Sequence, residues 1–235
     1  AFDSKMVKLW KERTEVLAET MVSGLPQDEP FDFISSIAYP LPIAMICEML
    51  GLKTSDREQL HSWTTDIAAF LDNSTNFEVA AKALASQASI SKYLNDEIEK
   101  YRSEPADNLI SYLLRLQEKN ESITDADILG NAVLIFAAGH ETTVALLSNL
   151  LLELVRNPQA LAAVRDDRGL LNAAIEETLR IQPPVHRTGR IVLEPIEWGN
   201  INIATGERVS LLLGAANHDP KKFESPGIFK LDRGK

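Results

Sequence analysis

Apolar residues recur every three or four positions up to about residue 182 of the 235-residue chain, which is the spacing of amphipathic helices. Gly, Pro and short polar clusters separate these segments and predict where the helices end. We expect a turn at Asn73–Thr75 and helices at about 4–23, 43–50, 55–71, 77–102, 108–116, 123–156, 158–165 and 170–182.

Beyond residue 182 the apolar residues alternate with polar ones, as they do in β-strands. We expect a small β region at about 185–213, with turns at Gly199-Asn200 and Thr205-Gly206, and an irregular stretch from Asn217 onward. A series of helices followed by this short β region predicts a fold class that is mainly α with a minor β part.

Asn131–Leu152 is an almost continuous apolar run whose apolar residues cover nearly every helical azimuth. Such a helix is expected to be buried on all sides. Its centre nevertheless reads Gly-His-Glu-Thr-Thr at 139–143. A glycine inside a helix costs about 1 kcal/mol relative to alanine, and a buried carboxylate without partners costs several kcal/mol more. Residues that are unfavourable for a buried helix tend to lie at functional sites, so we expect a functional site at 139–143.

Composition narrows the possible functions. The formal net charge of −10 argues against binding to nucleic acid or to an anionic membrane surface. The single cysteine, Cys47, excludes a disulfide framework and a cysteine metal cluster, and its apolar neighbours predict a place in the core. The apolar runs are too short and interrupted to predict a membrane segment, and the charged start does not resemble a signal peptide.

Glu141 and Thr142 are the first candidates for chemistry. On a helix, the Thr142 hydroxyl can bond to the carbonyl of Ala138 and loosen that turn, while Gly139 leaves room for another group to approach. An adjacent acid and alcohol at such a turn suit a proton relay. The alternative is a polar patch that faces another helix. A His-Glu-x-x-His zinc site is excluded because its fifth position is Val144.

Glu177 and Arg180 are three positions apart on the helix expected at about 170–182. Pairs at this spacing are usually solvated. The apolar residues around this pair predict a buried helix instead, in which a bidentate carboxylate–guanidinium pair is favoured. We expect a structural role for it.

His186, Arg187 and Arg190 follow a pair of prolines and enter the β region. Arginines on a short strand beside a buried helix suit an anionic ligand group. The alternative is a salt bridge from one of them to Glu194 or Glu197.

Four segments together carry a family resemblance. Ala138–Thr143 resembles the oxygen-activation motif on the central helix of cytochromes P-450, the haem-thiolate monooxygenases. Glu177–Arg180 resembles their Glu-x-x-Arg pair, and Gln182–Arg190 resembles the segment that follows it. Leu212–Pro220 is similar to the soluble bacterial branch. The order and spacing of these segments place residues 1–235 within one partial P-450 domain, so the fold is expected to be an incomplete P-450 fold.

The resemblance implies a cofactor and a reaction. Haem would be the cofactor of a monooxygenase that oxidises a small hydrophobic substrate with O2 and electrons from a ferredoxin or flavoprotein redox partner, in the cytoplasm. Glu141 and Thr142 would be the catalytic pair that delivers protons during oxygen activation. The site residues implied beside them are Ala138 and Gly139 on the haem face, Arg190 at a haem propionate, His186 beside the haem and substrate, Val185, Ile135 and 55–80 around the substrate, and Glu177 and Arg180 in the haem-side core.

The sequence departs from the family pattern in two places. The family's axial cysteine lies in a loop expected beyond Lys235, and Cys47 is in the wrong segment to replace it. Ile228 occupies a position where many members carry an arginine that completes a network with the Glu-x-x-Arg pair. We therefore expect a truncated or incomplete P-450 chain that self-associates through its exposed apolar haem-side surface. The alternatives are a haem-free P-450-like protein that assists another enzyme, and a helical binding module unrelated to haem.

Overall fold

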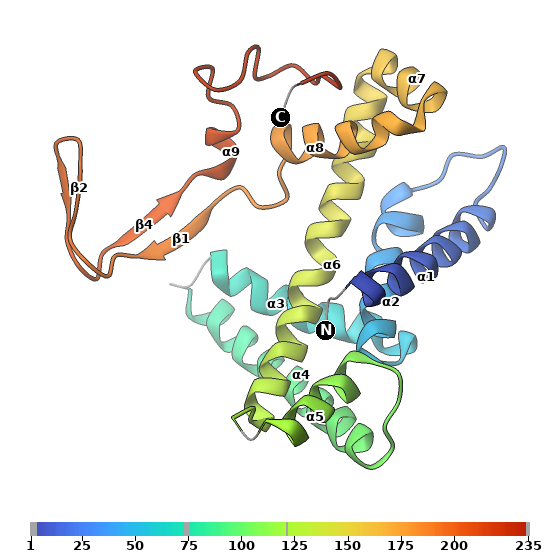
Figure 1. The fold of residues 1–235 in the computed structure, drawn as a ribbon, viewed down its shortest axis with the longest axis vertical. Helices are drawn as coiled ribbons and strands as arrows, with labels where there is room; N and C mark the ends of the chain where they lie inside the picture. The colour runs from blue at the N-terminus through green and yellow to red at the C-terminus, as the bar shows by residue number, and fades with distance from the viewer. Residues whose placement is uncertain (1–3, 73–75, 121, 234–235) are drawn as a thin grey trace. The chain divides into compact units, whose positions relative to one another are not determined.

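The computed structural model describes residues 4–72, 76–120 and 122–233, so the turn expected at Asn73–Thr75 lies outside the described residues. The chain forms two compact units, Ala1–Val144 (the first unit) and Ala145–Lys235 (the second unit). Their boundary lies inside helix α6, Asp125–Arg156, which the sequence places at about 123–156 (Figure 1).

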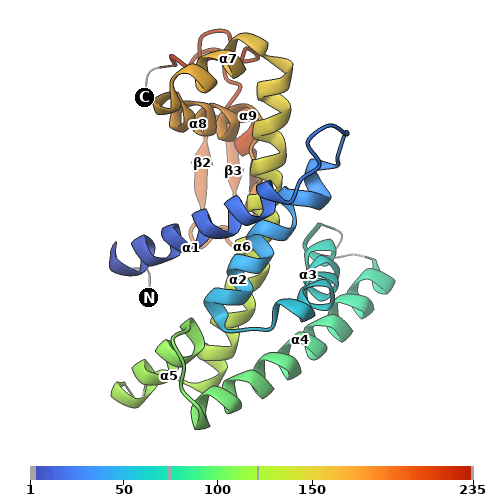
Figure 2. The ribbon, with the colours of Figure 1, turned by 90° about the vertical axis from the view of Figure 1, so that its right-hand side faces the viewer.

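Helices make up the described part of the first unit. They are α1 (Ser4–Ser23), a π-helix (Ile34–Ala38), α2 (Pro40–Leu50), a 3-10 turn (Thr54–Asp56), α3 (Arg57–Asp72), α4 (Phe77–Ser103), α5 (Leu109–Lys119) and the first part of α6. The helices predicted from the sequence are thus present. Figure 2 shows α3 and α4 side by side, and they pack along each other.

Local sequence explains where these helices begin and end. Proline begins α2, where its missing N–H costs nothing, and Gly51 ends it with a left-handed φ of 79°. At the start of α6 the Thr124 hydroxyl accepts a hydrogen bond from the Asp127 amide at 3.1 Å, and the Asp127 carboxylate accepts one from the Thr124 amide at 2.8 Å. This reciprocal arrangement is a capping box, so the start of α6 is set by adjacent residues.

The core of the first unit lies where α2, α3, α4, α5 and α6 meet. Cys47 is fully buried in it, as the sequence predicts. Its largest fully buried apolar side chains are Phe136, Ile43, Leu50, Leu60, Ile90, Leu94, Ile110 and Ile128.

The expectation that α6 is buried on all sides is wrong for the described residues. Ile128, Ala132, Phe136 and His140 form one buried stripe at i, i+4 spacing. Another stripe, which we call the open face, is exposed at Asn131, Leu134, Ala138 and Thr142. Leu134 is 62% exposed on it. Apolar residues therefore lie all around α6, but the described part of the chain covers only some of them.

By length and composition alone, α6 is apolar enough to cross a membrane, a test that core helices of soluble proteins also pass. The stripe from Ile128 to His140 packs into a protein core instead. The capping box at the start of α6 and the polar residues at its centre are also unlike a lipid-exposed span. We therefore treat α6 as the central helix of the fold.

The second unit holds the rest of α6 and the β region. Its further elements are α7 (Pro158–Asp166), a 3-10 turn (Arg168–Leu170), α8 (Leu171–Ile181), β1 (Thr188–Ile191), β2 (Ile196–Trp198), β3 (Ile201–Ile203), β4 (Arg208–Leu211) and α9 (Leu213–Ala216). The strands pair antiparallel as β1 with β4 and β2 with β3. Gly199 and Gly206 lie in the expected turns with positive φ.

A small apolar cluster supports this unit, in which Leu154, Val164, Ala174, Ile181 and Phe229 are buried. The Asn149 side-chain amide also donates to the Gln182 carbonyl at 3.0 Å and so ties α6 to the end of α8. The short helix α9 was not predicted. Its four residues are too few for helical periodicity to show in the sequence. The fold class, mainly α with a minor β part, is confirmed.

Candidate functional site

The centre of α6 directs its acid and its alcohol to different sides of the helix. The Thr142 hydroxyl donates to the Ala138 carbonyl at 3.0 Å, as the sequence predicts, and lies on the open face. Glu141 is half-buried and accepts a long hydrogen bond of 3.4 Å from the Thr65 hydroxyl of α3. Adjacent helical residues point about 100° apart, which explains this divergence.

Gly139 permits a close contact between two helices. A Cβ at this position would lie 2.6 Å from Cδ1 and 3.2 Å from Cγ1 of Ile46 on α2. The close approach that the sequence predicted is therefore made by an isoleucine side chain. That Gly139 also borders a haem remains a prediction.

His140 was not among the candidate residues, yet it is the most enclosed polar group of the motif. It is fully buried, its ring nitrogen Nδ1 lies 2.8 Å from the Phe136 carbonyl, and its Nε2 lies 3.1 Å from Nδ1 of His61 on α3. Burial lowers the pKa of His140, which favours the neutral ring. Its partner is 79 positions away in the sequence, so no local spacing could indicate the pair.

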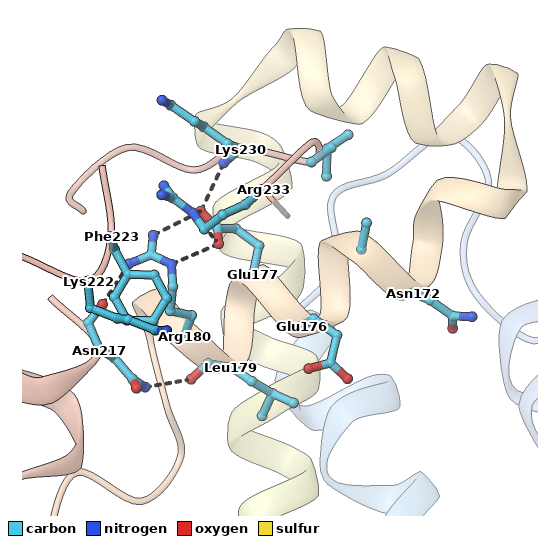
Figure 3. Close-up of a pocket in the computed structure, with 12 residues that line it drawn as sticks. Asn172, Glu176, Glu177, Leu179, Arg180, Asn217, Lys222, Phe223, Lys230 and Arg233 are labelled. Carbon is cyan, nitrogen blue, oxygen red and sulfur yellow. Dashed lines mark hydrogen bonds and ion pairs between the residues drawn. The ribbon is translucent and has the colours of Figure 1, made fainter. Parts of the chain in front are cut away.

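Glu177 and Arg180 form the buried bidentate pair that the sequence predicts (Figure 3). Arg180 donates from Nε and Nη2 to the two carboxylate oxygens, each at 2.8 Å. The Glu177 side chain is 3% exposed and the Arg180 side chain 7%. Arg180 also donates from Nη1 to the carbonyls of Asn217 and Pro226 at 2.8 Å, so it holds the irregular segment after α9 against α8.

The third member of this network corrects an expectation. The isoleucine at position 228 had put in doubt whether the network has a second arginine. Arg233 is that arginine, because its Nε lies 3.0 Å from both carboxylate oxygens of Glu177. Ile228 contributes its backbone carbonyl, which accepts a hydrogen bond from Arg233 Nη2 at 2.9 Å. The network thus has one buried carboxylate between two guanidinium groups.

Electrostatics keep Glu177 ionised. Burial alone would raise its pKa, but hydrogen bonds from Arg180, the Lys230 amide and Arg233 outweigh burial and leave the pKa lowered. A pocket of about 950 Å³ adjoins the network and is lined by residues that include Asn172, Glu176, Phe223 and Leu231 (Figure 3).

His186 and Arg190 lie in the second unit and are both exposed. Arg190 donates from Nη1 to the Thr188 hydroxyl at 2.9 Å and to the Gly189 carbonyl at 2.8 Å. Arg190 does not make the alternative salt bridge to Glu194 or Glu197, since among the described residues no carboxylate pairs with it. In the described part of the chain the Arg190 cation is held by two neutral oxygens, so it remains suited to an anionic ligand group.

The chain resembles known proteins over nearly its whole length. The cytochrome P-450 family matches residues 3–233. Cytochrome P-450 107B1 of Saccharopolyspora erythraea is 38% identical over 99% of this chain and 56% of its own length. The biotin biosynthesis cytochrome P-450 of Bacillus subtilis is 34% identical over 86% of this chain and 51% of its own length.

A solved structure gives the same result for the fold. That of CYP164A2 from Mycobacterium smegmatis with econazole bound superimposes with a TM-score of 0.93, at 30% identity, over 98% of this chain and 59% of that one. The mainly helical fold and the motifs of α6 and α8 therefore define a haem-thiolate class of protein. The chain belongs to the cytochrome P-450 family, with an incomplete P-450 fold that spans about half the length of the curated relatives it matches.

Proposed function

We propose that the whole protein is a haem-dependent monooxygenase that oxidises a small hydrophobic substrate with O2 and electrons from a redox partner. The observation that carries this proposal is the acid–alcohol pair on α6, with the Thr142 hydroxyl fixed on the open face. Glu141 is half-buried and is held by a single long hydrogen bond among the described residues, which suits a carboxylate that exchanges protons better than one that only stabilises a helix. Family membership supports the same reaction class.

The residues present fit the haem in part. Leu134, Ala138 and Thr142 form an exposed and mostly apolar stripe in which the small Ala138 leaves room for a flat ring. Arg190 offers a cation without an acidic partner among the described residues, which suits a propionate. Cys47 is fully buried among apolar side chains and is not available as an axial ligand.

When bound, haem supplies the reductive activation of O2. The chain's own part is to hold and move protons. Because Thr142 Oγ1 gives its hydrogen to the Ala138 carbonyl, its lone pairs are free to accept a hydrogen bond and orient a proton-bearing water. Among the described residues, Glu141 accepts only the long bond from Thr65, so its carboxylate is available for proton transfer.

The test of this assignment is Thr142→Ala in the full-length, haem-loaded protein, with Thr142→Ser as the matched control that keeps the hydroxyl. We expect Thr142→Ala to bind substrate normally while most electrons form peroxide or water rather than product. Thr142→Ser should retain most of the coupling. An unchanged yield of product per electron in Thr142→Ala would exclude the relay.

A second experiment examines the proposed contact of Arg190 with a propionate. Loss of a charge-assisted hydrogen bond costs about 1.5–3 kcal/mol, so Arg190→Ala should lose haem roughly 10–100 times faster to an acceptor protein. Arg208→Ala removes an exposed arginine from the paired strand β4 and serves as the control. Equal haem loss from both variants would reject the propionate contact.

One measurement distinguishes this enzyme from a haem-free P-450-like protein that assists another enzyme. The reduced full-length protein is treated with carbon monoxide, and its absorption spectrum is recorded. A thiolate-ligated haem gives a strongly red-shifted Soret band. A protein that binds no haem gives no such band, and its open face would then be an interaction surface.

A further inference from the structure

Three potential metal ligands converge within the first unit. They are His61 of α3 and His140 and Glu141 of α6, and one ligand atom from each lies within 4.8 Å of the others. The zinc motif excluded from the sequence required a second histidine on the same helix. The tertiary structure instead brings that second histidine from another helix.

The hydrogen bonds of His140 determine which of its nitrogens is available. Its Nδ1 faces the Phe136 carbonyl at 2.8 Å, and a carbonyl can only accept, so the proton must be on Nδ1. Nε2 then carries a lone pair directed toward His61. A ring whose other nitrogen donates to a backbone carbonyl is the usual arrangement of a histidine that ligates a metal. The lowered pKa of His140 agrees with this neutral state.

The spacing of the two rings suits a shared ion. His61 Nδ1 is 3.1 Å from His140 Nε2. Two nitrogens bound to one tetrahedral zinc at about 2.0–2.1 Å are about 3.3 Å apart, so an ion requires a small separation of the rings and a tilt that turns both lone pairs toward it. Ring contacts also orient them, since His61 packs edge-on against Tyr39 at 4.8 Å between centroids and His140 packs against Phe136 at 5.2 Å.

Glu141 provides the negative charge. Its carboxylate is half-buried and accepts a hydrogen bond from the Thr65 hydroxyl at the long distance of 3.4 Å. A rotamer change therefore costs little and brings an oxygen to the ion. Two imidazole nitrogens and one carboxylate oxygen, with water as the fourth ligand, form a set that suits Zn²⁺ and other divalent transition metals.

We propose that His61, His140 and Glu141 form a binding site for a divalent transition metal that links α3 to α6. In the metal-free state His61 donates its Nδ1 proton to His140 Nε2. In the metal-bound state that proton is on His61 Nε2, and both facing nitrogens bind the ion. One consequence rests on the proposed function: an occupied site withdraws Glu141 from proton transfer, so the metal would inhibit turnover reversibly.

The test is zinc binding by the purified full-length protein after treatment with a chelator. Calorimetry should show one equivalent of Zn²⁺ with submillimolar affinity, and Co²⁺ in its place should give the visible absorption bands of a tetrahedral site. His61→Gln should weaken binding at least tenfold, and Glu141→Gln should weaken it measurably. His218→Gln, which changes a histidine of the second unit, is the matched control and should bind as the wild type does.

Failure of zinc to bind at one equivalent would overturn the proposal, as would equal affinities in wild type and His61→Gln. His140 is fully buried, so its substitution is avoided, and circular dichroism verifies that the other variants are folded. If His61→Gln does not fold, the result rests on whether zinc raises the melting temperature of the wild type more than that of Glu141→Gln. These readouts measure the metal, so they remain valid if turnover proves not to depend on Glu141.

Discussion

Replacing Glu177 with Gln should destabilise the second unit by about 3–5 kcal/mol, which is the usual cost of removing one partner from a buried ion pair. Gln keeps the shape of the side chain but not its charge. The Arg180 and Arg233 side chains, 7% and 13% exposed, would then face each other without a counter-charge. The amide nitrogen of Gln would also point a donor at guanidinium donors.

The hydrogen bonds that the Glu177 carboxylate accepts support this magnitude. Arg180 and Arg233 each make two of them, and the Lys230 amide makes another at 3.0 Å. A hydrogen bond to a charged group contributes about 1.5–3 kcal/mol, but bonds within one network are not additive. The total is therefore close to that of one broken buried pair rather than to the sum.

The assay is urea unfolding followed by circular dichroism, with Glu176→Gln as the control. Glu176 is the exposed neighbour of Glu177, so the same chemical change there should alter the free energy of unfolding by less than about 0.5 kcal/mol. Equal losses in the two variants would refute the reasoning. A double-mutant cycle with Arg233→Gln then measures the coupling between Arg233 and Glu177.

The same network predicts a dependence on pH. The pKa of Glu177 lies below its usual value of 4.5, so the unfolded state takes up the proton first as the pH falls. The stabilisation by Glu177 is thus complete above about pH 4.5 and is lost as the pH falls through the lower pKa of the folded state. The stability difference between the wild type and Glu177→Gln should be constant near neutral pH and shrink in acid. A difference that grows in acid would contradict this sign.

Packing and burial lead to three further predictions. Gly130→Ala should stabilise α6 by up to about 1 kcal/mol, since nothing lies within 4 Å of a Cβ at that position. Gly139→Ala should be about 1–3 kcal/mol less stable than Gly130→Ala, because its new Cβ would clash with the Ile46 side chain. Adding Ile46→Val should recover part of that loss in thermal unfolding, and no recovery would exclude the contact as its cause. Burial raises the pKa of Cys47 to about 11, so a thiol reagent at pH 8 should react rapidly only after unfolding. The 235-residue chain should self-associate in sedimentation velocity, and Leu134→Lys on the open face should reduce this, whereas a monomeric wild type at high concentration would contradict it.

Local interactions explain why much of this protein could be predicted from sequence. Helix ends follow from nearby residues, as at Gly51 and in the Thr124–Asp127 capping box. The bond from Thr142 to Ala138 and the pair of Glu177 and Arg180 join residues three or four positions apart, so helix geometry alone brings them together.

The contacts that the sequence could not indicate join distant residues. Arg233 reaches Glu177 across 56 positions, and His61 reaches His140 across 79. The Ile46 side chain occupies the space beside Gly139. The sequence predicted that some group approaches Gly139 but could not identify it. Periodicity shows which residues of a helix are apolar but not which segment covers them, so the sequence predicted an exposed apolar surface without identifying the residues of α6 that form it.

The sequence by itself thus determined the helices, the family and the local pairs, because these depend on interactions within one or two helical turns. The tertiary structure decided the partners of the buried charges and of His140, because helix packing alone brings such distant side chains together. It also decided which face of α6 is covered, since burial depends on the elements that surround a helix and not on its own residues.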